Sequence, residues 1–79
     1  MPNNANIIKG KNMAKQGANQ IKEGVNQIAN GMNQTANGNA KEGTRNIKEG
    51  QNKINNGANK VNNGNQMMAN GAKNALQQQ

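Results

Sequence analysis

Apolar and polar residues alternate along the chain with a helical rhythm. Apolar side chains recur three and four positions apart, as in Val25, Ile28 and Met32. This spacing places them on one face of an α-helix, whereas a β-strand would direct them to opposite faces. The pattern therefore predicts amphipathic helices. Asn-Gly dipeptides, which are frequent here, are also typical of β-hairpin turns, so a solenoid or fibril with asparagine ladders is the alternative structure.

Glycine marks a repeat of seven residues. The ten glycines lie at 10, 17, 24, 31 and 38 and then at 43, 50, 57, 64 and 71. With glycine at position g of each heptad, apolar residues concentrate at position d, position a is mixed, and positions b, c and f are almost wholly Asn, Gln, Lys and Glu. We therefore expect a stripe of positions g, a and d to form the packed face of each helix.

The residues expected to pack between the helices are Gly10, Gly17, Gly24, Gly31, Gly50, Gly57, Gly64, Gly71, Ile21, Ile28, Ile47, Ile54, Val61 and Met68. The apolar residues at position a are Ala18, Val25, Met32, Ala58 and Ala72. A second, smaller contact face is expected at position e, which holds Ile8, Ala29, Ala36, Ala69 and Leu76.

The repeat is interrupted once, by a step of five between Gly38 and Gly43. Five residues turn a helix about 140° beyond one full turn, so a continuous helix would carry its second set of glycines to another face. Asn37-Gly38 suits a left-handed helix C-cap, and Asn39 with Glu42 three residues later matches a capping box. The sequence thus predicts one all-α domain, an antiparallel two-helix hairpin with arms at 4–37 and 41–76 and a turn at 38–40.

The predicted hairpin gives the glycines a reason to be there. A glycine inside a helix costs about 0.8 to 1 kcal/mol relative to alanine, and close approach of two backbones would offset this cost. The alternative is that position g faces water and the glycines only loosen the helix. A fold-back at residues 40–41 predicts the pairs Gly38 with Gly43, Gly31 with Gly50, Gly24 with Gly57, Gly17 with Gly64, Gly10 with Gly71, Ile28 with Ile54 and Ile21 with Val61.

Composition limits what such a hairpin does alone. The chain has 79 residues and no Phe, Tyr, Trp or Cys, so its core is thin and no disulfide supports it. We expect a hairpin of marginal stability that associates with other copies into a larger bundle or filament. No apolar run is long enough for a signal peptide or a membrane span, so a cytoplasmic location is the simplest expectation.

The same composition argues against an enzyme. Lys, Glu and two Thr are scattered over different helical faces, and no spacing indicates a metal, cofactor or small-molecule substrate site. We expect a non-catalytic structural or protective protein that self-associates or shields surfaces. The segment KGKNMAKQGANQIKEGVNQIANG (Lys9–Gly31) is similar in composition to stress-protective hydrophilins and late-embryogenesis-abundant proteins, although these typically carry eleven-residue repeats and more charged residues.

The net charge of +7 keeps two binding functions open. One is binding of nucleic acid or another polyanion without sequence readout. Its candidate phosphate contacts are Lys15, Lys22, Lys48, Lys53 and Lys60. The other is binding of the amphipathic helices to a lipid surface. Binding to ice by the repeated Asn at position b is a further hypothesis.

Overall fold

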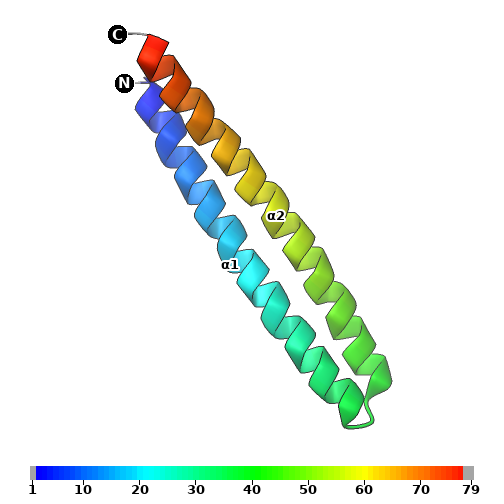
Figure 1. Ribbon diagram of the computed structural model, residues 1–79. Coiled ribbons are helices and arrows are strands. Elements are labelled where there is room, and N and C mark those ends of the chain that lie inside the picture. The colour runs from blue at the N-terminus through cyan, green and yellow to red at the C-terminus, as the bar shows by residue number, and fades with distance from the viewer. Residues whose placement is uncertain (1, 78–79) are drawn as a thin grey trace.

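The computed structural model describes residues 2–77, which form two long helices joined by a short turn (Figure 1). Helix α1 spans Pro2–Ala36 and helix α2 spans Ala40–Gln77. The helices run antiparallel and side by side, so the start of α1 and the end of α2 lie at the same end of a rod (Figure 1). This arrangement confirms the predicted all-α helical hairpin. The helix bounds differ from the expected ones by one or two residues.

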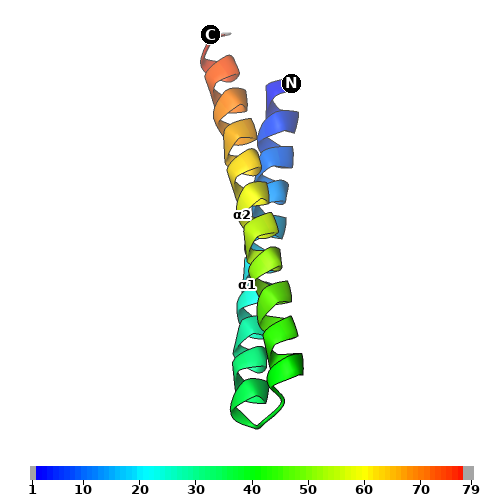
Figure 2. The ribbon, with the colours of Figure 1, turned by 90° about the vertical axis from the view of Figure 1, so that its right-hand side faces the viewer.

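The two helices wrap around each other along the rod. The Cα trace extends 62 Å in length and 12 Å in each other direction. In Figure 2, α2 passes in front of α1 and lies on opposite sides of it at the two ends of the rod. A strict seven-residue repeat has 3.5 residues per turn, which requires this kind of left-handed supercoil to keep the same positions in contact.

The turn is a Schellman motif. Gly38 has a φ of 100°, the left-handed conformation in which glycine carries no penalty. The amide of Gly38 donates to the carbonyl of Thr35 at 3.1 Å, and the amide of Asn39 donates to the carbonyl of Gln34 at 2.8 Å. These are the two bonds that define the motif, and they satisfy carbonyls at the end of α1 that lack a helical partner.

Helix α2 starts at once after this turn. Asn39 is its N-cap, because its carbonyl accepts the first helical bond, from the amide of Gly43 at 2.9 Å. The predicted capping box, in which the side chains of Asn39 and Glu42 bond to each other's backbone amides, does not form. The amide of Asn39 already donates to Gln34, and the carboxylate of Glu42 accepts a hydrogen bond from Arg45 at 2.7 Å instead of returning to Asn39. The Schellman motif and the capping box compete for the same donor, and the Schellman motif takes it.

The helices meet through glycines, one heptad away from the predicted register. Gly24 lies against Gly50, where the fold-back at 40–41 predicted Gly57. The other facing pairs are Gly10 with Gly64, Gly17 with Gly57 and Gly31 with Gly43. The predicted partner of Gly43 was Gly38, but Gly38 serves the turn, so Gly43 faces the preceding glycine of α1 and every later pair shifts by seven residues.

The contact at each pair leaves no room for a side chain. A Cβ atom on Gly24 would lie 2.6 Å from the Gly50 carbonyl oxygen and 3.1 Å from the Ile54 amide nitrogen. A Cβ on Gly50 would meet the Gly24 carbonyl oxygen at 2.6 Å in return. Because these obstacles are backbone atoms, neither helix gives way by a side-chain rotation. The glycines of both helices are buried, including Gly71 near the end of α2.

Replacing Gly38 by alanine tests the turn. A Cβ there meets nothing within 4 Å, so any effect arises from the backbone conformation alone. Alanine in the left-handed conformation costs roughly 1 to 2 kcal/mol, and we expect Gly38→Ala to lower the free energy of unfolding by that amount in urea denaturation. The exposed helical control Asn30→Ala should leave stability unchanged or raise it slightly. An unchanged midpoint for Gly38→Ala would contradict the turn geometry.

Replacing Gly24 by alanine tests the close contact. Alanine is the better helix former by about 0.8 to 1 kcal/mol, but overpacking against backbone costs about 1 to 3 kcal/mol, so we expect Gly24→Ala to lower the melting temperature. The exposed neighbour Asn26→Ala should raise it. In a double-mutant cycle, Gly24→Ala should couple to Gly50→Ala more strongly than to Gly57→Ala, because only Gly50 shares its contact. Stronger coupling to Gly57→Ala would contradict the observed register and favour the one predicted from the sequence, in which Gly24 faces Gly57.

Candidate interaction surface

The hairpin has two broad sides of different chemistry. Position g faces the neighbouring helix, so positions c and d, about 50° to either side of it, border the contact. In an antiparallel pair both c rows lie on one side and both d rows on the other. We call the side formed by positions c and f the polar side, and the side formed by positions d and a the apolar side.

The predicted stripe of positions g, a and d is therefore wrong by one position. Position a lies about 100° from the line joining the two helices, too far to touch the partner of a simple pair. Val25 and Met32 at position a are 52% and 60% exposed. Position c, and not position a, borders the glycine contact. Met13 and Met67 are half-buried at this position, although its mostly polar residues did not indicate packing.

On the apolar side, the d side chains lie over the glycine contacts. A Cβ on Gly24 would approach Cγ1 of Ile54, and one on Gly50 would approach Cγ1 of Ile28. Ile28 lies four residues from Gly24 in the direction of the turn, and Ile47 lies three residues from Gly50 in the same direction. Because the two glycines face each other and a helix rises 1.5 Å per residue, the two isoleucines are level within about 1.5 Å.

By the same offset, Ile21 is level with Ile54 and Ala14 with Val61. The predicted pairing of Ile28 with Ile54 and of Ile21 with Val61 is displaced by one heptad, as the glycines are.

No hydrophobic residue in the described part of the chain is fully buried. The isoleucines at position d, together with Val61 and Met68, are only half-buried, and the fully buried residues are glycines. At position e, Ile8 and Leu76 are 58% and 71% exposed. The apolar side thus consists of a row of half-buried side chains at position d and, beside it, a row of exposed residues at position a.

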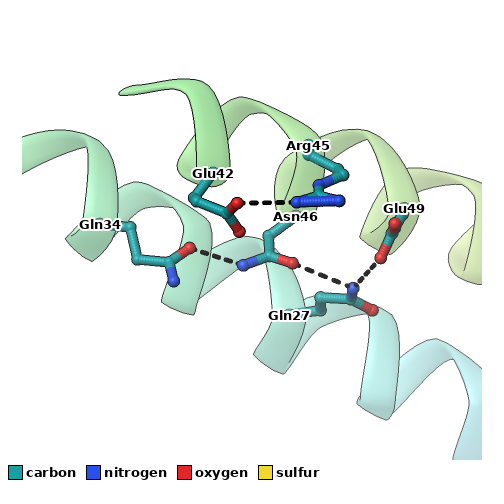
Figure 3. A network of polar contacts seen from close by, with 6 residues as sticks. All are labelled: Gln27, Gln34, Glu42, Arg45, Asn46 and Glu49. Atoms are coloured by element: carbon teal, nitrogen blue, oxygen red, sulfur yellow. Dashed lines mark hydrogen bonds and ion pairs between the residues drawn. The ribbon is translucent and has the colours of Figure 1, made fainter. Parts of the chain in front are cut away.

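The polar side carries hydrogen bonds between the helices (Figure 3). The side-chain amide of Asn46 donates to Oε1 of Gln34 at 2.5 Å, and the side-chain amide of Gln27 donates to Oε2 of Glu49 at 2.8 Å. A longer contact of 3.5 Å joins the Gln27 amide to Oδ1 of Asn46. These residues at positions c and f link α1 to α2, so the side chains that the sequence pattern treats as solvated are in part interhelical contacts.

The ion pair beside this network stays within α2. Arg45 donates to Glu42 at 2.7 Å, and this hydrogen bond raises the pKa of the Arg45 guanidinium. Both side chains are exposed, at 63% and 56%, so the pair adds little to stability.

The candidate phosphate contacts do not meet in one place. Lys15, Lys22 and Lys48 lie at position e and are exposed along the outer margins of the apolar side, the first two on α1 and the third on α2. Lys53 and Lys60 lie at position c, on the polar side, where Lys53 is half-buried. The five lysines therefore form no single basic row.

Comparison with protein-family models, with curated proteins and with solved structures finds no match to this chain. Over residues 2–77, neither helix has a stretch long and apolar enough to cross a bilayer. The same residues hold no group of three or more His, Cys, Asp or Glu side chains arranged to bind a metal ion.

Replacing Asn46 tests the polar side. Asn46→Ala removes the bond to Gln34 and the contact to Gln27, and we expect it to lower the free energy of unfolding by about 0.5 to 1.5 kcal/mol. Asn52→Ala, an exposed replacement at position b of the same helix, is the matched control and should be neutral or slightly stabilising. Equal effects of both replacements in urea denaturation would contradict an interhelical role for Asn46.

Proposed function

We propose that this protein is a non-catalytic structural or protective protein whose hairpin packs its apolar side against another surface. That surface belongs either to another copy of the chain or to a molecule that the protein shields. The observation that supports the proposal is the absence of any fully buried hydrophobic residue among those described, together with the location of most half-buried ones on the apolar side, Met13 and Met67 being the exceptions.

The free energy of folding also favours a covered apolar side. Fixing each residue in one conformation costs on the order of 1.5 kcal/mol, and burial of apolar surface is the main term that opposes this cost. A single hairpin buries only part of each d side chain and keeps the rest in contact with water. Covering the apolar side completes that burial and stabilises the fold, because any partner that binds only the folded state shifts the equilibrium toward it.

A lipid surface is the second candidate partner. Lys15, Lys22 and Lys48 lie along the margins of the apolar side, where long basic side chains accompany amphipathic helices on anionic membranes. Binding of polyanions has less support, because the lysines are divided between the two sides. A salt-dependent gel shift on arbitrary DNA would favour the polyanion function over both.

A concentration series tests the proposal in its self-associating form. We expect the helical circular dichroism signal to fall on dilution and the sedimentation coefficient to fall with it, because the fold depends on covering the apolar side. Helicity that is independent of concentration in a species that stays monomeric would exclude self-association. If that monomer also failed to bind other surfaces, the proposed function would be wrong.

A further inference from the structure

We propose that the apolar side binds a second copy of this chain, so that two hairpins stack into a four-helix bundle. The inference rests on the proposed function, because it names the surface that covers the apolar side. It is carried by the position of the a and d rows around each helix, by their composition, and by the size and charge of the side.

The angles of the heptad positions match a four-helix bundle. In a square bundle each helix has one neighbour in its own hairpin, a second neighbour at about 90° in the other hairpin, and the bundle axis at about 45° between them. With 3.5 residues per turn, position g faces the first neighbour, d lies about 51° from it and a about 103°. The d residues thus point to the axis and the a residues to the second copy.

The d layers then close into a core. Ile28 and Ile47 are level on one hairpin, and a second hairpin whose turn lies at the same end adds the same two residues, giving four isoleucines around the axis. Ile21 and Ile54 form the next layer in the same way. The half-buried state of these side chains in one hairpin is what such a layer requires, because the remaining half faces the other copy.

The a row fits a second helix better than a lipid surface. It contains the small residues Ala18, Ala58 and Ala72, which allow helices to approach closely, as glycine does at position g. It also contains Gln51 and Asn65, whose amides would lack partners in hydrocarbon but find them on a facing helix. No aromatic residue is present to anchor the side in a membrane interface.

The side is large enough for a stable dimer. The Cα trace measures 62 Å by 12 Å, so one broad side has a footprint on the order of 700 Å², close to the roughly 800 Å² that each partner buries in a standard protein interface. The twist of the rod does not interrupt this side, because the seven-residue repeat keeps d and a at constant angles to the partner helix along the whole supercoil.

The charge distribution predicts how salt acts. In the stacked dimer, the lysines of position e from the two copies flank the new interface, and the chain has net charge +7, so the copies repel each other. Added salt screens this repulsion over about 10 Å at 0.1 M and should strengthen association. Salt has the opposite effect on binding to an anionic lipid or nucleic acid.

Paired substitutions at positions a and b test the interface. Val25→Lys and Asn26→Lys add the same charge at neighbouring exposed positions, and neither removes a packed side chain of the single hairpin. We expect Val25→Lys to raise the dimer Kd in sedimentation equilibrium by about tenfold or more, and Asn26→Lys to change it by about twofold or less.

The outcomes separate this inference from the function it rests on. A dimer that strengthens with salt and responds at position a but not at position b supports the four-helix bundle. A chain that stays monomeric but binds vesicles of phosphatidylserine and phosphatidylcholine, more weakly in high salt and after Val25→Lys, overturns the bundle and leaves the proposed function intact. A helical monomer that binds neither itself nor vesicles overturns both, and equal effects at positions a and b overturn the bundle alone.

Discussion

The distance between the two helices is fixed by the absence of side chains at position g. Where a Cβ atom on Gly24 would stand, the structure has the carbonyl oxygen and amide nitrogen of the other helix. Backbones this close gain dispersion contacts along the whole rod, and they bring positions c and d to the borders of the contact. The division of the hairpin into a polar and an apolar side follows from this approach, since bulky residues at g would have separated the helices and filled the contact themselves.

The two sides stabilise the hairpin in different ways. Side chains such as Gln27 and Asn46 on the polar side form directional contacts across the helices, and these fix how the helices are rotated. Buried amides add little net free energy, and the Oε1 atoms of Gln20 and Gln27 are buried without a hydrogen-bond partner. The isoleucines of the apolar side are half-buried, so a single hairpin covers only part of their apolar surface. The hairpin therefore has directional contacts between its helices on the polar side, whereas its apolar side stays partly exposed to water.

Much of this fold is predictable from the sequence because its signals are local. The three-and-four spacing of Val25, Ile28 and Met32 identifies a helix, and the five-residue step at Gly38 identifies the turn. The register is not predictable in this way, because every heptad offers an equivalent glycine and a slip by seven residues costs nothing in the pattern. What selects it is the use of Gly38 as the left-handed residue of the turn, a choice that competes with its use as a packing residue.

The packed face was harder to predict for a related reason. Apolar residues at position a suggest that this position packs against the neighbouring helix, but a contact between only two helices spans an arc centred on g that includes c instead. The apolar positions of a sequence can belong to several different packing surfaces of a helix, whereas a single hairpin contains only one helix–helix contact. The mismatch at Val25 and Met32 therefore marks the surface on which the proposed function depends.

The repetition of one contact along the rod also makes its length adjustable. Each facing pair of heptads contributes the same glycine contact and its own apolar layer, and these contacts join only residues that are close along the rod. Loss or gain of one heptad in both arms would change the rod by about 10 Å and leave the turn and all other layers in place. The length of such a rod can therefore change in fixed steps of one heptad, because an insertion that is not a multiple of seven residues rotates the glycines out of the contact.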